Sequence, residues 1–506
     1  MESANNVVGE RAKNDPIGSD LEDNLNKLKA IFVYPENKDF IIRDIHIKAI
    51  NIDGKILYLH GTVNGDIIEK HIIMPLLEKS EPNESNENIC AFLMKSIITG
   101  RNVKKVSSFK EISNEIINGN TILLIKGHNE AISVSTTKYE HRSVEKPTTE
   151  NALKGPKESF TESCSVNRSL IRKHLKDSKL ISESIILDTT VFNEIFIMYI
   201  KDIANPQLLE EVRARLSKIS MENVKNLSIL EQYIEDKTYS LVPTVLLTER
   251  PDRVVAFLEE GYVAMLMEGA PYSLIVPVTI WSFFHTSEDQ YQRWAYGNFT
   301  RLLRMIACYI ALLTPGLYIA VSSYHIDMIP TDLVLAIAAS REKLPFPAII
   351  EVLLMELAFD LIREAGVRVP TPIGPTIGIV GALILGQAAV QANIVSPILV
   401  IVVSLTGLSS FAIPETSLNF MIRIGRFIFL FAGAAMGFYG MAVCFAVLIT
   451  YLSTIKSFGV PFNSPIAPYY KSSKDTITRP PAWKQLLRPS FLRPMDKVRS
   501  KKPKGE

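Results

Sequence analysis

The feature that most constrains this chain is a stretch of 46 residues, Val369 to Pro414, without a single Asp, Glu, Lys or Arg. Charged residues make up 21% of the whole sequence, so this stretch differs sharply from the rest. A helix needs about 20 apolar residues to cross the hydrocarbon layer of a bilayer, so the stretch has room for two crossings. Core helices of a large soluble protein are the alternative, but a helix packed in water normally keeps one polar face. The stretch therefore predicts a membrane protein.

Two further uncharged segments, Met305–Ile326 and Phe427–Ile455, are each long enough for one span. Together the segments predict four spans, at residues 303–325, 373–392, 395–412 and 427–452. Four spans keep both termini on one side. We expect that side to be the cytoplasm, because the N-terminus has no apolar signal segment and the C-terminal tail is basic. If residues 346–364 crossed as a fifth span, the tail would lie outside, against the positive-inside rule. Either that helix is therefore re-entrant or interfacial, or residues 273–290 cross as well.

The residues before 301 have the patterns of an α/β protein. FIIRDIHI (40–47) and KILYLHGT (55–62) alternate as strands do, whereas DIIEKHIIMPLLEK (66–79) and SFKEISNEIING (108–119) have helical spacing of apolar residues. Farther along, TVLLTE (244–249), PDRVVAFLEEG and YVAMLMEG give a strand, a helix and a strand, which favours a second subdomain with some parallel pairing. The predicted fold class is an α/β cytoplasmic head of two small subdomains followed by an α-helical multi-span membrane domain.

The predicted organisation has six parts. They are a disordered N-terminus (1–25), cytoplasmic α/β subdomain 1 (26–138), a connection (139–165), α/β subdomain 2 with an aromatic interfacial segment (166–300), a helical membrane domain of four to six helices (301–455) and a basic, Pro-rich cytoplasmic tail (456–506). The tail has twelve Lys or Arg against three acidic residues, so we expect it to be solvated or to contact lipid head groups. Few aromatic residues interrupt it, so nucleic acid is not an expected partner.

The sequence contains one helix with charges inside the membrane half, FPAIIEVLLMELAFDLIREAG (346–366). Glu356, Asp360 and Glu364 follow one another at intervals of four residues and share one face, while Glu351 lies about 180° around the helix from Asp360. Ionisable groups at membrane depth usually face water or a partner, so Glu351, Glu356, Asp360 and Glu364 are the candidate residues of an ion path. The alternative is that Arg363 neutralises Asp360 and that the helix lies at the interface.

Small residues recur in two predicted spans, and they predict close packing of neighbouring helices. These residues are Gly374, Gly378 and Gly381 in one span and Gly433, Gly437 and Gly440 in the other. Motifs of catalysis and nucleotide binding such as GxxxxGK[ST], GxSxG, HExxH and GxGxxG are absent, and the four cysteines have no zinc-like spacing. We therefore expect no enzymatic activity, catalytic residues, cofactor, metal site or disulfide.

Several segments resemble the GerA-type spore germination proteins, specifically the A subunit of germinant receptors. The matching segments are RSVEKPTTENALKGPKESFTES (142–163), NRSLIRKHL (167–175), TERPDRVVAFLEEG (248–261), RLLRMIACYIALLTPGLYIA (301–320) and the long run from Phe346 to Pro397. They occur in the order of the family. The first 130 residues are similar to the family only in general pattern.

The resemblance implies a receptor subunit in the inner membrane of a bacterial endospore, assembled with a transporter-like B subunit and a lipoprotein C subunit. It also implies that nutrients trigger the complex and that A subunits form a homo-oligomeric ring that conducts ions. The residues alone support membrane embedding, a cytoplasmic head and an ion path. The alternatives are a non-conducting scaffold or signal-transducing subunit, and the paralogue that acts with dipicolinate release.

Overall fold

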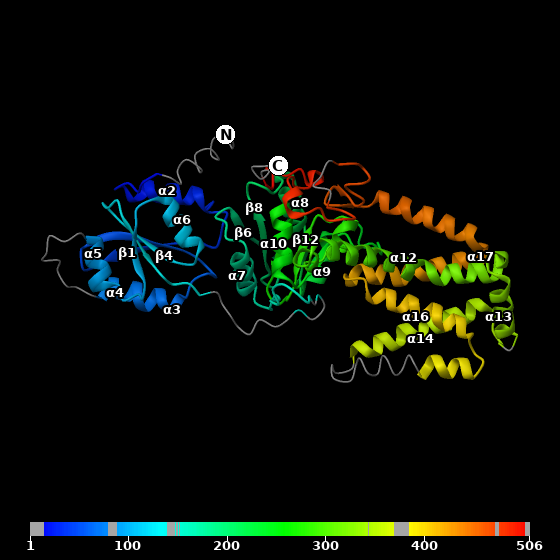
Figure 1. Ribbon diagram of the computed structural model, residues 1–506. Helices are drawn as coiled ribbons and strands as arrows, with labels where there is room; N and C mark the ends of the chain where they lie inside the picture. Colours follow the sequence, from blue (N-terminus) through cyan, green and yellow to red (C-terminus); the bar gives the residue numbers. More distant parts are fainter. Residues whose placement is uncertain are drawn as a thin grey trace.

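The computed structural model describes residues 15–78, 89–138, 147, 150, 152–342, 344–368, 384–470 and 475–500. Three bodies follow one another along the molecule: two α/β subdomains and a helical bundle (Figure 1). This arrangement confirms the predicted fold class of an α/β head followed by helices that are long and apolar enough for a membrane.

Subdomain 1 is a five-stranded antiparallel sheet covered by helices on both faces. Its strands have the order β1 (Phe40–Ile47), β2 (Ile52–Leu59), β4 (Thr121–Ile125), β5 (Ala131–Val134) and β3 (Val103–Val106). One face packs against α2 (Leu21–Ile31) and α6 (Phe109–Ile117). The other packs against α3 (Gly65–Ile68), η1 (Glu69–Ile73), α4 (Met74–Glu78), α5 (Ile89–Phe92) and η2 (Leu93–Ile97). Because the central strand β4 is covered on both faces, its last four residues, ILLI, are all apolar rather than alternating.

Local sequence signals explain the element boundaries of this subdomain. Helix α6 begins after Ser108, whose side chain accepts a hydrogen bond from the Glu111 amide at 3.3 Å. The helix is followed by Gly119, which has a φ of +86°. The disorder predicted for residues 1–25 is wrong for residues 21–25, which belong to α2, and residues 1–14 lie outside the described residues.

Subdomain 2 contains a second five-stranded sheet with helices on both faces. The strand order is β10 (Leu246–Thr248), β12 (Ser273–Val276), β11 (Val263–Met267), β8 (Glu194–Ile200) and β6 (Leu180–Ile186). Helices α7 (Cys164–His174) and α10 (Pro251–Glu260) belong to the core on one face, and α8 (Pro206–Ser217) and α9 (Leu227–Ile234) to the core on the other. Four helices thus enclose the sheet.

The parallel pairing predicted for this sheet is wrong. Strands β10 and β11, which flank α10 in sequence, run in the same direction, but β12 lies between them and pairs antiparallel with both. Among the described residues, the parallel pairing is confined to the two-residue strands β7 (Asp188–Thr189) and β9 (Ser220–Met221). Residues 273–290, considered as a crossing, instead contain the buried strand β12, the short helix η3 (Ile280–Phe283) and the first residues of α11 (Glu288–Tyr291).

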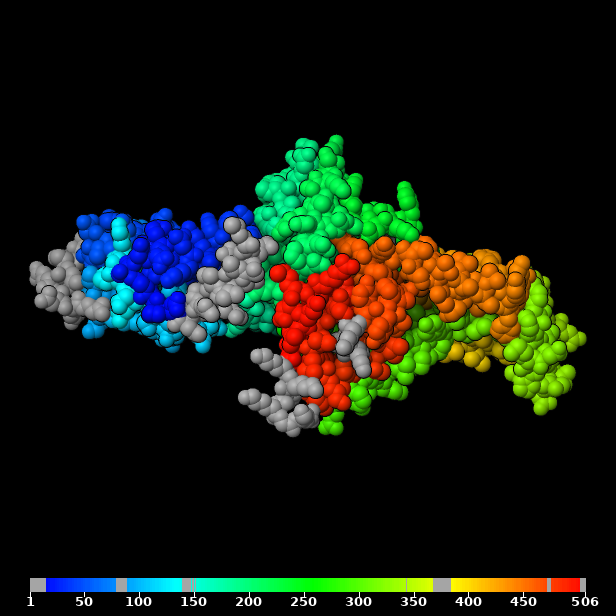
Figure 2. Space-filling model, turned by 90° about the horizontal axis from the view of Figure 1, so that it is seen from above, coloured from blue at the N-terminus to red at the C-terminus, as the bar shows by residue number. Residues whose placement is uncertain are grey.

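The C-terminal tail is folded onto subdomain 2 rather than solvated, which corrects that prediction. Phe462, Phe491 and Leu492 are buried in the core that also contains α7 and α10. The Arg488 side chain donates to the Glu259 carbonyl at 2.8 Å, and the Met495 amide donates to the Ile203 carbonyl at 3.0 Å. Figure 2 shows this segment spread over one face of the molecule. Apolar side chains between the prolines and basic residues explain the difference, because they bury against the head.

The helical bundle consists of α12 (Trp294–Tyr324), α13 (Thr331–Arg341), α14 (Ala348–Arg368), α16 (Pro397–Phe411) and α17 (Thr416–Thr454). Two of them, α12 and α17, are long and apolar enough to cross a membrane. The predicted span 395–412 corresponds to α16, whose 15 residues extend about 22 Å, short of the roughly 30 Å hydrocarbon layer. Part of the predicted span 373–392 lies outside the described residues.

Helix α17 reverses its direction at Gly437, so the single span predicted at 427–452 is wrong. Gly437 has φ 59° and ψ −138°, a conformation outside the helical region. Both ends of α17 reach subdomain 2: Glu415 pairs with Arg253, and the Tyr451 hydroxyl donates to Ser240 at 2.9 Å. A straight helix of 39 residues would place its ends about 58 Å apart. The two halves therefore form a hairpin, as Figure 1 shows at the far end of the bundle.

This reversal determines on which side of the bundle the tail lies. Helix α12 runs away from the head to Tyr324, whose hydroxyl donates to the Ala434 carbonyl beside the reversal. The second half of α17 brings the chain back, so both the head and the tail lie at one end of the bundle. A crossing by residues 273–290 is not needed to place them there.

Candidate functional site

Helix α14 places its four carboxylates in three different environments. Glu356 and Asp360 face the first half of α17, whereas Glu351 faces the start of α16 and accepts a hydrogen bond from the Ser396 amide at 3.2 Å. Glu351 and Glu356 are each 1% exposed, Asp360 is partly buried and Glu364 is exposed. The structure thus brings Glu356 and Asp360 together and separates both from Glu351.

Two arginines of α17 neutralise this pair of carboxylates. Arg426 lies 2.8 Å from Glu356 Oε2 and donates through Nη2 to Asp360 Oδ2 at 2.6 Å. Arg423 pairs with the other oxygen of Asp360 at 3.1 Å. Two guanidinium groups therefore balance two carboxylates inside the bundle, an arrangement that lowers the cost of keeping charges there.

The alternative that Arg363 neutralises Asp360 is wrong. Arg363 donates to the Ser410 hydroxyl at 2.8 Å and lies over the ring of Phe411 at 4.4 Å. The arginines that do pair, Arg423 and Arg426, were missed, although their spacing of three residues at the start of an apolar helix indicated one charged face.

The glycines predicted to pack helices have three distinct roles. A Cβ on Gly433 would lie 2.6 Å from the Gly316 carbonyl oxygen, so α12 and α17 touch backbone to backbone there. Gly437 forms the reversal, and a Cβ on Gly440 would overlap the Ala432 carbonyl oxygen across the hairpin. The three do not line one face of one helix, because the chain turns between them. Gly374, Gly378 and Gly381 lie outside the described residues.

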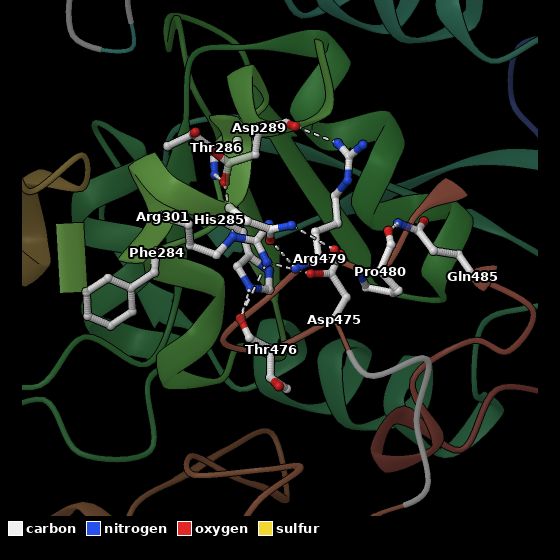
Figure 3. Close-up of polar contacts among 12 residues, drawn as sticks. Phe284, His285, Thr286, Asp289, Arg301, Asp475, Thr476, Arg479, Pro480 and Gln485 are labelled. Atoms are coloured by element: carbon white, nitrogen blue, oxygen red, sulfur yellow. Dashed lines mark hydrogen bonds and ion pairs between the residues drawn. The ribbon is translucent and has the colours of Figure 1, made fainter. Parts of the chain in front are cut away.

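A second cluster of charges joins the head, the first bundle helix and the tail (Figure 3). Asp289, 2% exposed, pairs with Arg301 at 3.2 Å and with Arg304, and both arginines belong to α12. Arg301 also pairs with Asp475 of the tail at 2.5 Å. Arg479 of the tail donates to the Asp289 carbonyl oxygen. The tail therefore holds the start of α12 against the head.

Burial changes the pKa values of the ionisable groups in this cluster. Burial, together with the nearby Arg301 guanidinium, lowers the pKa of His285 to about 4, and its ring donates to the Thr476 carbonyl at 2.9 Å. Burial alone would raise the pKa of Asp289, but hydrogen bonds from Arg304 hold it below the ordinary value. At neutral pH the cluster contains an uncharged imidazole and an ionised carboxylate.

Arg253 of α10 joins four segments at the same junction. Its Nη1 donates to Glu150 of the connection at 2.7 Å and to Glu415, the residue before α17, at 3.3 Å. Its Nη2 donates to the carbonyl oxygens of Ser282 and His285. Burial raises the pKa of Glu415 to about 7. Glu150 and Arg253 lie in segments that resemble the family, at 142–163 and 248–261, but only the fold brings them together with Glu415.

The described residues contain no group of three His, Cys, Asp or Glu side chains placed to hold a metal ion. The fold and its sites define a class of protein: a two-part α/β head fastened by buried ion pairs to a helical bundle with apolar, exposed surfaces. The sequence profile of the family described as "Bacillus/Clostridium GerA spore germination protein" matches residues 26–491. The chain belongs to this GerA family.

Relatives with published names support the assignment. The chain is 40% identical over 468 residues to spore germination protein KA of Bacillus subtilis (strain 168), covering 92% of this chain and 86% of the relative. It is 38% identical to GerLA of Bacillus cereus, covering 90% of this chain and 93% of the relative. It is 37% identical to protein B1 of Bacillus subtilis (strain 168), covering 96% of this chain and all of the relative. The crystal structure of the N-terminal domain of the A subunit of the Bacillus megaterium spore germinant receptor GerK3 matches with 28% identity and a TM-score of 0.42, covering 52% of this chain and 97% of that chain.

Proposed function

We propose that this protein is the A-type membrane subunit of a nutrient germinant receptor that triggers endospore germination, and that it oligomerises into a nutrient-gated cation channel. Membership of the GerA family and the names of its relatives support the role in germination. The proposed location is the spore inner membrane, with both termini in the cytoplasm. The proposed partners are a transporter-like B subunit, a lipoprotein C subunit, further copies of this chain and membrane lipid.

The observation that carries the channel proposal is the set of carboxylates on α14 and their arginine partners on α17. Arg423 and Arg426 neutralise Glu356 and Asp360. We infer from this pairing that the bundle is in a closed state. A small displacement of α17 relative to α14 would release the two carboxylates. Repeated around an oligomer, released carboxylates would attract cations. Glu351, on the opposite side of the helix, is expected to hold the start of α16, and Glu364 to lie near the exit of the path.

The experiment is potassium release from germinating spores that carry Glu356→Gln or Asp360→Asn. Glu351→Gln provides the comparison on the same helix. We expect the first two variants to change the rate of potassium release at least tenfold, and Glu351→Gln to change it less than twofold at equal protein levels. Normal release by both Glu356→Gln and Asp360→Asn spores would eliminate this face of α14 as the path.

A non-conducting scaffold or signal transducer is the second candidate. It is favoured by the neutralisation of Glu356 and Asp360 within a single chain, which leaves this pair of carboxylates without excess charge. Purified protein in planar bilayers, with and without the B and C subunits, separates the two functions. Conductance that depends on nutrient supports the channel, and its absence from the complete complex supports the scaffold.

A further inference from the structure

A group of exposed apolar and aromatic side chains lies beside the point where α17 returns to the head. They belong to the loop between α9 and β10, to the last turn of α17 and to the turn after strand β14 (Val460–Pro461). This aromatic rim consists of Tyr239, Leu241, Tyr451, Ile466 and Tyr469. Tyr239 is fully exposed and Tyr469 is 82% exposed. Single exposed apolar residues are ordinary on protein surfaces, but a cluster of them usually marks a surface that binds a partner.

Polar contacts hold the three segments of the aromatic rim together. The Tyr451 hydroxyl donates to Ser240 Oγ at 2.9 Å, so the loop between α9 and β10 lies against the last turn of α17. The Asn463 side chain donates to Ser453 Oγ at 3.2 Å. Asn463 begins the turn that carries the two rim residues of the tail, so this turn is fixed to the same end of α17. The aromatic rim is therefore one fixed surface built from three segments.

An exposed apolar stripe of α17 leads directly into the aromatic rim. Val443, Val447 and Tyr451 follow one another at intervals of four residues on the second half of this helix, and all three are exposed. Helix α17 is one of the two helices that are long and apolar enough to cross a membrane. Lys456 is the first charged residue after the reversal at Gly437, so the hydrocarbon layer would end close to Tyr451. The rim thus lies at the depth of the membrane interface, where tyrosine side chains are enriched.

The charges around the aromatic rim favour an anionic partner. Lys237 and Lys456 are exposed, and the Lys237 ammonium group lies 5.5 Å from the centre of the Tyr451 ring. The two acidic residues of the loop are already bonded within the protein. These contacts join Asp236 to Arg215 at 2.6 Å and Glu235 to the Thr244 hydroxyl at 3.1 Å. Aromatic rings next to exposed lysines match the boundary between acyl chains and anionic lipid head groups.

We propose that the aromatic rim seats the head on the membrane surface, with its tyrosine rings at the level of the lipid head groups and with Lys237 and Lys456 at anionic phosphates. The proposal rests on the membrane location proposed above and adds a contact between lipid and the head itself. Subdomain 2 then has two attachments to the bilayer, one through the bundle and one through the rim. Lipid therefore restricts motion of the head relative to the bundle, together with the ion pairs at the junction.

The test places a tryptophan in the aromatic rim of the full-length protein, reconstituted in lipid nanodiscs. The fluorescence of Tyr239→Trp is quenched with lipids that carry a nitroxide on the head group and, separately, with aqueous iodide, after subtraction of the signal of Trp281, Trp294 and Trp483. Tyr34→Trp is the matched control, since Tyr34 is an exposed tyrosine with a lysine 5.6 Å from its ring centre. Tyr34 follows α2, which lies in the subdomain farther from the bundle (Figure 1). We expect the nitroxide to quench Tyr239→Trp at least threefold more strongly than Tyr34→Trp, and iodide to quench it at least twofold more weakly.

Val447→Trp separates this proposal from the membrane location on which it rests. Val447 lies within the exposed stripe of α17, so lipids brominated on the acyl chains should quench its replacement strongly. If they do, and Tyr239→Trp behaves like Tyr34→Trp, the bundle is embedded and the rim proposal alone is overturned. Protection of Tyr239→Trp from both the nitroxide and iodide would indicate that a second copy covers the rim, which also overturns the proposal. Absence of quenching in Val447→Trp would remove the membrane location, and the rim proposal with it.

The charge of the lipid tests the role of the two lysines. Nitroxide quenching of Tyr239→Trp should be at least twofold stronger in nanodiscs that contain phosphatidylglycerol than in nanodiscs of neutral phosphatidylcholine. Adding Lys237→Gln and Lys456→Gln should abolish this difference. Adding Lys201→Gln instead, at an exposed lysine that pairs with Glu36 on the head, should leave the difference unchanged. Equal quenching in the two lipids, or a difference that persists without the two lysines, contradicts their assignment to anionic head groups.

Discussion

Removal of Arg426 should expose how strongly the bundle depends on its internal ion pairs. Arg426 is 4% exposed and contacts both Glu356 at 2.8 Å and Asp360 at 2.6 Å. In Arg426→Met, Asp360 keeps Arg423, but Glu356 is left buried without its ion-pair partner. Breaking a buried pair from one side costs about 3–5 kcal/mol, so we expect a loss of that size in the free energy of unfolding. Arg423→Met should cost less, about 1–2 kcal/mol, because Asp360 keeps Arg426.

A double-mutant cycle tests the pairing of Arg426 with Glu356. Glu356→Gln alone leaves Arg426 paired with Asp360 and should cost about 1 kcal/mol. In the double variant of Arg426→Met and Glu356→Gln, no buried carboxylate is left without an ion-pair partner. Its loss in the free energy of unfolding should therefore be smaller than the sum of the two single losses by at least about 2 kcal/mol. Equilibrium unfolding in mixed micelles measures each value, with the exposed Glu210→Gln on α8 as a control expected to stay within about 0.5 kcal/mol. Additive losses, or a loss below about 1 kcal/mol in Arg426→Met, would refute the assigned pairing.

Three further predictions concern packing, the head and pH. Gly433→Ala should destabilise the bundle by about 1–3 kcal/mol, because its Cβ would lie 2.6 Å from the Gly316 oxygen. Gly386→Ala is the control and should not destabilise it, because its Cβ would meet Val400 at an ordinary 3.4 Å. Equal unfolding midpoints of the two variants would contradict the close approach of α12 and α17. Asp39→Asn should lower the free energy of unfolding by about 3–5 kcal/mol, because Asp39 is 1% exposed and accepts hydrogen bonds from Arg168 at 2.5 Å and Arg172 at 2.7 Å. Asp44→Asn, at an exposed carboxylate, is the control. His285→Gln should reduce the acid sensitivity of folding. The pKa of His285 falls from 6.5 to about 4 on folding, so below pH 6.5 the unfolded chain binds a proton that the folded protein does not, and stability decreases by up to about 3 kcal/mol as pH falls to 4. Parallel stability curves for His285→Gln and the wild type over that range would show that the imidazole is not responsible.

The sequence predicted the local structure correctly where one short-range signal, such as alternation or a helix cap, dominates. Residues 40–47 form the strand expected from their alternation, and the helix expected at 108–119 forms as Phe109–Ile117 between the Ser108 cap and Gly119. Strand β12 was harder to assign, since an apolar run that is buried on both sides of a sheet has the composition of a membrane segment. The antiparallel insertion of β12 between β10 and β11 depends on contacts between distant residues, which no local pattern records.

In the candidate sites, too, the sequence indicated single residues but not the distant residues that they contact. The carboxylates of α14 stood out because charges are rare among apolar residues, but their partners lie 63 or more residues farther along the chain, on α17. At the junction, Glu150, Arg253 and Glu415 occur in three separate segments. Spacing along the chain cannot predict contacts among such distant residues, because the contacts depend on how helices and loops pack against one another.

By itself, the sequence determined that the chain combines a charged α/β head with apolar helices, because uncharged runs and alternation reflect the solvent that each segment meets. Only the tertiary structure decided how many times those helices pass along the bundle. The reversal at Gly437 lies within an apolar segment whose composition suits one helix, and its φ of 59° is available to glycine without steric cost. Contacts with Tyr324 and the return of α17 to the head select that conformation, and hydropathy carries no information about them.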